Sequence, residues 1–171
     1  MVVAGFAGLA GTWRIVKERK EELLERFSAS YLDRILDYDI SKTERLLTEW
    51  RTYGAAECEP SGFGGILKTL WDLSGAYMTG ICFCLRDIPI KQETVEICER
   101  YDLNPYRLLS TGCYLLAVDN GGDLVRELKK DQLPAAVIGK VTEGVGRVIE
   151  HEEGRGFLDR PTEDELHKII L

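Results

Sequence analysis

Gly112-Cys113-Tyr114-Leu115-Leu116-Ala117-Val118 is the clearest strand signal in the chain. Almost every residue of this run is apolar, which is typical of a strand that is covered on both faces and lies inside a sheet. The next four residues, Asp119-Asn120-Gly121-Gly122, favour a turn, and a short helix is predicted after them over residues 123–130. The sequence therefore predicts a sheet with this strand in its interior.

On both sides of this strand, short β-type runs alternate with amphipathic runs, which favours an α/β or α+β domain. Strands are predicted over residues 2–6, 55–58, 77–85, 135–142, 147–150 and 157–158. Helices are predicted over residues 12–27, 41–53, 64–74 and 92–101, with a terminal helical turn after Pro161. No internal repeat or flexible linker interrupts the sequence, so a single domain over residues 1–171 is expected.

Three local signals add detail to this outline. Thr12 is a predicted N-cap of the first helix, because its side-chain oxygen can accept a free backbone N–H. Ser41 followed by Glu44 has the spacing of a capping box. Glu143-Gly144-Val145-Gly146 predicts a hairpin between the strands that flank it.

Charge and cysteine content limit the partners and the compartment. The chain has 22 basic and 29 acidic side chains and a formal net charge of −7. Duplex nucleic acid and anionic membranes bind through clustered Lys and Arg, so neither is an expected partner. The cysteines are odd in number and widely spread, which indicates free thiols and a cytoplasmic location. They are Cys58, Cys82, Cys84, Cys98 and Cys113.

The first of two glycine clusters is Gly5-Phe6-Ala7-Gly8-Leu9-Ala10-Gly11-Thr12, between a predicted strand and a predicted helix. Glycine lets the backbone approach a ligand closely, and a helix start offers free N–H groups, so a phosphate could bind here. The spacing matches neither the dinucleotide-binding fingerprint nor the P-loop. An ordinary strand–helix turn explains the same residues, and both interpretations remain open.

The second glycine cluster, Glu59-Pro60-Ser61-Gly62-Phe63-Gly64-Gly65, lies at a similar junction. It could form an anion-binding loop, with Glu57 and Glu59 as Mg²⁺ ligands beside it. The alternative is a flexible turn in which Ser61 caps the following helix and the carboxylates are solvated.

No set of catalytic or metal-binding residues can be identified. Cys82 and Cys84 alternate along a predicted strand and so share one face, but two ligands do not make a zinc site. The two histidines, His151 and His167, have no ligand spacing. The pair of cysteines is therefore interpreted as core thiols.

Several segments, taken in order, resemble one family. They are Gly8-Leu9-Ala10-Gly11-Thr12, Gly64-Gly65-Ile66 before Leu70-Trp71-Asp72-Leu73, Ile88-Pro89-Ile90-Lys91-Gln92-Glu93-Thr94-Val95-Glu96-Ile97-Cys98-Glu99, Leu103-Asn104-Pro105-Tyr106-Arg107-Leu108-Leu109-Ser110-Thr111-Gly112, and Ile138-Gly139-Lys140-Val141. In this order they resemble the C-terminal domain of aminoimidazole ribonucleotide (AIR) synthase-related proteins. That superfamily includes the hydrogenase expression/formation proteins and the selenophosphate synthetases. The resemblance covers essentially the whole chain and is most specific from Ile88 to Gly112.

The resemblance implies a three-layer α/β/α sandwich with a mixed sheet. Members of the superfamily also have an N-terminal domain that dimerises and carries most of the residues that bind ATP and metal, and this domain is absent from the sequence. The resemblance therefore implies that ATP and Mg²⁺ bind only together with an N-terminal domain, as a separate partner or within an oligomer. The residues that would face the phosphate side of the shared cleft are Gly8, Gly11, Thr12, Ser61, Gly62, Gly64 and Gly65.

The function implied is that of a C-terminal domain contributing glycine-rich loops to a cleft for a nucleotide or small phosphorylated ligand. The reaction would be an ATP-dependent maturation or ligase-type step, which the chain does not catalyse alone. The sequence departs from the family at Glu59-Pro60-Ser61-Gly62-Phe63, which replaces an Asp-x-Thr-x pattern and is one residue longer. The alternative is a degenerate, non-catalytic homologue that acts as a protein-interaction or regulatory module.

Overall fold

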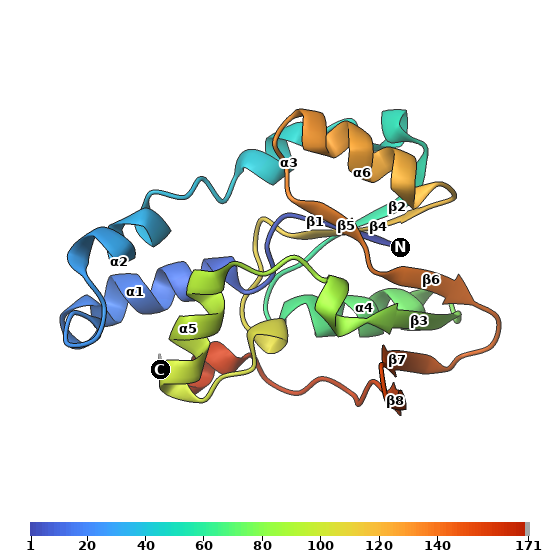
Figure 1. The fold of residues 1–171 in the computed structure, drawn as a ribbon. Coiled ribbons are helices and arrows are strands. Elements are labelled where there is room, and N and C mark those ends of the chain that lie inside the picture. The colour runs from blue at the N-terminus through green and yellow to red at the C-terminus, as the bar shows by residue number, and fades with distance from the viewer. Residues whose placement is uncertain (170–171) are drawn as a thin grey trace.

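The strands form two four-stranded sheets in the computed structural model, which describes residues 1–169 (Figure 1). The first sheet is antiparallel and has the order β2 (Ala55–Pro60), β4 (Tyr114–Val118), β1 (Val2–Ala4), β5 (Ala135–Val137). The second has the order β6 (Gly139–Thr142), β3 (Gly80–Cys84), β7 (Arg147–His151), β8 (Gly154–Phe157). In this second sheet β3 and β7 are parallel and the other pairs are antiparallel. The predicted interior strand is confirmed, because β4 lies between β2 and β1.

The first sheet is covered on both faces, which gives the expected three layers of an α+β fold (Figure 1). On one face, α6 (Gly121–Lys130) packs against an apolar cluster that includes Leu116. On the other face, α4 (Gly65–Ala76) and the second sheet pack against a cluster that includes Leu115. Successive strand residues point to opposite faces, so the continuous apolar sequence of β4 supplies both cores. The strands are nevertheless divided between two sheets rather than joined in one.

Three helices form a third apolar cluster beside the sheets (Figure 1). They are α1 (Leu9–Leu23), α2 (Ala29–Leu36) and α5 (Gln92–Tyr101). The bounds of α5 are those predicted from its sequence. By contrast, α2 is unexpected; it begins after Ser28, whose hydroxyl accepts the backbone N–H of Tyr31 as an N-cap.

The segment 41–53 is less helical than predicted. It contains α3 (Lys42–Leu46) and a separate 3₁₀ turn at Trp50–Tyr53. Ser41 makes no side-chain cap, because its hydroxyl donates to the carboxylate of Asp39 at 2.7 Å. The predicted capping box is therefore wrong.

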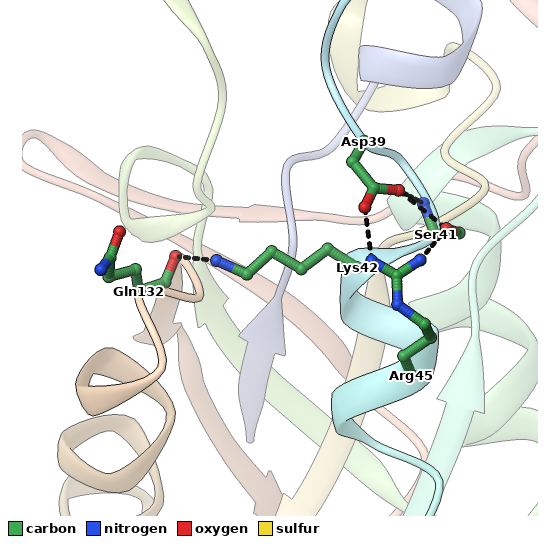
Figure 2. A network of polar contacts seen from close by, with 5 residues as sticks. All are labelled: Asp39, Ser41, Lys42, Arg45 and Gln132. Carbon is green, nitrogen blue, oxygen red and sulfur yellow. Dashed lines mark hydrogen bonds and ion pairs between the residues drawn. The ribbon is translucent and has the colours of Figure 1, made fainter.

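A polar network surrounds the start of α3 instead (Figure 2). Arg45 donates to both Asp39 and Ser41 on one side of the helix. On the other side, Lys42 Nζ donates to the backbone carbonyl of Gln132 at 3.3 Å. Because Gln132 follows α6, this last contact links α3 to the end of that helix.

The predicted hairpin at residues 143–146 is also wrong, because β3 lies between β6 and β7. The loop crosses the start of β3 at Gly80, where a Cβ would lie 2.4 Å from the hydroxyl oxygen of Thr142. The missing side chain of Gly80 therefore makes the crossing possible. The predicted strand over 135–142 is divided at the buried Ile138, where the chain passes from the first sheet to the second.

The five cysteines are free. Burial raises the pKa of the Cys113 thiol to about 12, and that of Cys98 to about 12, so both are protonated at neutral pH and poor nucleophiles. Cys82 and Cys84 share a face of β3 as expected, but their interpretation as core thiols is wrong. Both are only half-buried, because Ile81 and Phe83 occupy the inward face. Across residues 1–169, no helix has both the length and the hydrophobicity that crossing a membrane requires.

Candidate functional site

Four segments that are distant in sequence meet at one end of the first sheet. They are the first glycine loop (residues 5–12), the second glycine loop (residues 59–65), the bridging segment (residues 102–112) and the C-terminal segment (residues 158–169). β1 and β2 both pair with β4, and the ends of these two strands lie opposite its start. The sheet therefore brings the two glycine loops to the same edge.

The first glycine loop starts α1 earlier than predicted. The helix begins at Leu9 after Gly8, which has a left-handed conformation (φ 71°). Thr12 lies inside the helix, fully buried, and its hydroxyl donates to the Gly8 carbonyl at 2.9 Å. The predicted N-cap at Thr12 is wrong, because glycine adopts the left-handed conformation readily and ends the loop four residues earlier.

The glycines of this loop are positions of close packing. A Cβ on Gly11 would lie 2.4 Å from Leu108 Cγ, and one on Gly8 would lie 2.8 Å from the Pro105 carbonyl oxygen. Their N–H groups are donated within the chain, from Gly8 to the Ser110 hydroxyl at 2.8 Å and from Gly11 to a bridging-segment carbonyl at 2.9 Å. Phosphate binding by this loop stays a prediction. In the structure the loop packs the start of α1 against the bridging segment.

The second glycine loop is a tight turn that opens α4. The Gly62 carbonyl accepts the Gly65 N–H at 3.1 Å, and Gly64 between them is left-handed (φ 85°, ψ 0°). These angles fit the third position of a type II turn, which favours glycine. Gly65 is also left-handed (φ 68°), and a Cβ there would lie 2.4 Å from the Tyr106 carbonyl oxygen. The last two glycines are therefore required by the backbone.

Ser61 does not cap α4, because Gly64 is the N-cap residue and the structure records no side-chain cap there. The Ser61 hydroxyl instead accepts from the Thr69 hydroxyl at 2.9 Å inside the protein. Its backbone N–H donates to the Cys113 carbonyl at 2.8 Å. Ser61 thus fixes the end of β2 to β4 and to the first turns of α4.

Ser110 joins the two glycine loops. This fully buried residue donates its backbone N–H to the Gly62 carbonyl at 3.1 Å, and its hydroxyl accepts the Gly8 N–H at 2.8 Å. The hydroxyl also donates to the Leu108 carbonyl at 2.8 Å. Sequence reasoning did not select Ser110, because no local signal distinguishes it from Thr111, the hydroxyl residue that follows it.

Asp164 connects the C-terminal segment to the second loop. Its carboxylate is 4% exposed and accepts three backbone N–H groups: Gly64 at 2.6 Å, Leu109 at 3.2 Å and Leu166 at 2.8 Å. Asp164 is also the N-cap of the final 3₁₀ turn (Glu165–Lys168). Its sequence signal was that of a helix-start residue, which says nothing about the distant Gly64.

An open hollow of about 390 Å³ borders the second glycine loop. It is lined by Phe63, Gly64, Lys68, Thr162, Glu163, Asp164 and His167. Phe63 is 57% exposed and stacks on His167 with 6.3 Å between ring centroids. Lys68 forms an ion pair with Asp72 one turn further along α4. The hollow therefore combines the start of a helix and a cationic side chain with two carboxylates, those of Glu163 and Asp164, and the Gly64 N–H at its rim is donated to Asp164.

The acidic residues beside the loop do not form a metal centre with neighbours. Within residues 1–169, no group of three or more His, Cys, Asp or Glu side chains is arranged to hold a metal ion. A hydrogen bond from the Tyr77 hydroxyl to Glu57 raises the pKa of that tyrosine. Mg²⁺ ligation by Glu57 and Glu59 stays a prediction.

The sequence significantly matches no protein-family model and no curated protein, but solved structures match the fold. E. coli HypE, a hydrogenase maturation protein, has a TM-score of 0.73 and 20% identity over 99% of this chain and 52% of that chain. A HypE structure in complex with ATP has a TM-score of 0.66 and 15% identity over 96% and 51%. Thiamine-monophosphate kinase from Stenotrophomonas maltophilia has a TM-score of 0.62 and 16% identity over 87% and 49%.

These similarities concern the fold, because the sequence identities are low. The chain spans about half the length of the solved structures that it matches. HypE and thiamine-monophosphate kinase are both AIR synthase-related proteins, so the fold that the sequence resemblance implied is confirmed. The chain has the α+β fold that AIR synthase-related proteins share, over the length of about half of one such protein.

Proposed function

We propose that this chain is the C-terminal half of an ATP-using, AIR synthase-like unit. It would contribute its second glycine loop to a nucleotide-binding cleft shared with an N-terminal domain. In this proposal Ser61, Gly62, Gly64 and Gly65 border the phosphates. Gly8, Gly11 and Thr12 support that loop from behind through Ser110. ATP and Mg²⁺ are then bound between the two domains, in a maturation or ligase-type reaction whose catalytic groups come from the other domain.

The left-handed turn at Gly64 carries this proposal. It places a backbone N–H and the start of α4, a helix of 12 residues, at the rim of an open hollow. Lys68 lies one turn into the helix on the same rim and adds a positive charge. Backbone N–H groups at a helix start with a nearby cation are the usual means of holding a phosphate. Solved structures with this fold include a complex with ATP.

An apolar surface at the opposite end of the first sheet supports the need for a second domain. Tyr77, Met78, Val137 and Val141 are between 45% and 79% exposed. Val141 lies on the edge strand β6 and lines two adjoining hollows, one with Tyr77 and one with Val137. The matched structures are about twice as long as this chain. We therefore propose that the N-terminal domain covers this surface and also extends along the sheet to the second glycine loop, where it completes the cleft. A homo-oligomer formed through this surface is the alternative, and the solution mass of the isolated chain tests it.

The test is a chimera in which this chain replaces the half of E. coli HypE that it matches. Titration calorimetry with Mg-ATP should show binding by the chimera and roughly tenfold weaker binding after Lys68→Ala, the loss of one charge-assisted contact. Lys129→Ala, on the exposed side of α6, is the matched control and should bind as the parent does. A folded chimera that binds no Mg-ATP in any of these forms contradicts the proposal.

The second candidate is a non-catalytic interaction module. The observation that favours it is that the Gly64 N–H is already donated to Asp164 in this structure. HypE has been solved in a HypE–HypF complex, so a protein of this fold does assemble with another protein. If the chain captures a defined protein partner with an affinity that Mg-ATP leaves unchanged, this second function replaces the first.

A further inference from the structure

The carboxylate of Asp164 occupies the position where the second glycine loop would hold an anion. Two of the three N–H groups that it accepts belong to the body of the domain, those of Gly64 and Leu109. The third, from Leu166, belongs to the C-terminal segment itself. In residues 1–169 the structure records no ion pair between Asp164 and a cationic side chain, so backbone N–H groups hold this charge. Such groups bind a carboxylate or a phosphate oxygen by the same interaction.

Several other contacts keep the C-terminal segment in place. Leu166 is 2% exposed and packs in the cluster of α1, α2 and α5. Glu165 is 7% exposed; its carboxylate accepts the Asn104 N–H at 3.2 Å and the Lys168 ammonium at 2.5 Å. The Ile169 carbonyl accepts from an arginine of α1 at 2.9 Å. The segment is therefore a folded strap across the bridging segment and the second loop.

We infer that this strap is an internal competitor for the anion cradle formed by the Gly64 and Leu109 N–H groups. These two groups donate to a phosphate oxygen only when Asp164 leaves them. The inference rests on the proposed function, since it takes a phosphate as the ligand of the second loop. It adds that the cradle is closed in the isolated domain and opens when residues 162–168 detach. Ligand affinity then depends on the fraction of molecules in which the strap is released.

The test compares two aspartates of the C-terminal segment in the full chain. Asp164→Ala removes the internal anion and should strengthen binding of inorganic pyrophosphate at least tenfold, as measured by titration calorimetry. Asp159→Ala makes the same charge change, but Asp159 is exposed, does not line the hollow beside the second glycine loop and takes part in no recorded ion pair within residues 1–169. It should leave the affinity as in the wild type. In ¹H–¹⁵N spectra the Gly64 and Leu109 amides should shift on binding.

A folded Asp164→Ala chain that binds pyrophosphate no better than the wild type overturns the inference. If Asp164→Ala does not fold, the wild-type chain provides the test at saturating pyrophosphate. Competition predicts that the Leu166 amide loses its protection from hydrogen exchange as the Gly64 amide shifts. A Gly64 shift with Leu166 still protected overturns the inference, and so does the absence of any Gly64 shift.

These results are separate from the test of the proposed function. If Asp164→Ala opens the cradle while the HypE chimera with the same substitution binds no Mg-ATP, the strap inference stands and the proposed function fails. If the chimera binds Mg-ATP equally well with Asp164 and with Ala at this position, the strap inference fails alone.

Discussion

The two glycine loops share a strand–loop–helix context, yet their glycines serve different purposes. In the first loop, Gly8 and Gly11 are buried against the bridging segment, and both of their N–H groups are donated inside the protein. The second loop reaches solvent at Phe63 and borders a hollow, and its Gly64 N–H is donated to a carboxylate. A glycine-rich junction can thus reflect close packing in one place and an anion-binding backbone in another.

The largest effect that we expect is the loss of stability when Gly8 of the first loop is replaced. Gly8→Ala forces a left-handed residue with a side chain against Pro105 and Thr94, with Cβ contacts of 2.8 and 2.9 Å. The left-handed conformation costs about 1–2 kcal/mol, and overpacking adds roughly 1–3 kcal/mol. Chemical denaturation should therefore show a loss of about 2–5 kcal/mol.

Gly62→Ala in the second loop is the control for this change. A Cβ at Gly62 meets no atom within 4 Å. Its expected effect is neutral or slightly stabilising, by up to about 1 kcal/mol, because alanine restricts the unfolded chain. Equal losses for the two variants would show that the first loop is not the more tightly packed one.

The fold was largely readable from the sequence where a segment carried its own signal. The apolar run from Gly112 predicted an interior strand, and the helix at 92–101 was placed at its observed bounds. The failures came from long-range contacts. No local pattern says that β3 inserts between β6 and β7, since that depends on Gly80 meeting a loop more than 60 residues away.

The same distinction applies to the site. Its glycines were visible in sequence because unusual backbone angles leave a local signal. Ser110 and Asp164, which hold the loops together, were not selected, since their partners lie 102 and 100 residues away. A single sequence does not reveal pairings of this kind, whereas the fold fixes them.

The next largest effect on stability concerns the buried junction between the two loops. Cys113 lies there, with its carbonyl accepting from Ser61, and burial raises the pKa of its thiol to about 12 from an ordinary 9.0. Below pH 9 the thiol is protonated in both states. As the pH rises further, the unfolded chain ionises first, so stability is lost between pH 9 and about 12.

Cys113→Ala tests this contribution. At pH 11, two pH units above the ordinary value, the thiol should account for roughly 2–3 kcal/mol of lost stability. Denaturation at pH 8, 9, 10 and 11 should therefore show a shallower decline in Cys113→Ala than in the wild type. Parallel pH profiles would show that water reaches this thiol, and that the junction between the loops is not a dry core.

The Ser110 hydroxyl is the next test of the junction. Ser110→Ala leaves the buried Gly8 N–H without its acceptor, which costs about 1–3 kcal/mol. Ser30→Ala, at an exposed position in α2, should change stability by at most about 0.5 kcal/mol. Hydrogen exchange of the Gly8 amide should accelerate in Ser110→Ala alone. An unchanged Gly8 exchange rate would mean that Ser110 does not hold the first loop.

The smallest expected effect comes from an exposed carboxylate that, like Asp164, accepts a backbone N–H. Asp39 accepts from the Ser41 N–H at 3.1 Å and from Arg45 in the network of Figure 2. The hydrogen bond from Arg45, followed by that from Ser41, lowers its pKa from 3.8 to about 2. The stabilisation that follows is present above pH 4 and is lost as the pH falls towards 2.

Asp39→Asn should therefore lower the melting temperature at pH 7 by a few degrees at most, because solvent screens an exposed ion pair. The difference from the wild type should shrink between pH 4 and pH 2 in thermal scans. Burial is what distinguishes the two carboxylates: Asp164 is 4% exposed, whereas the Asp39 side chain is 52% exposed. If Asp39→Asn cost as much stability as Ser110→Ala, the stabilisation from a hydrogen bond to a backbone N–H would not depend on burial. The buried junction between the loops would then contribute no more to stability than an exposed contact does.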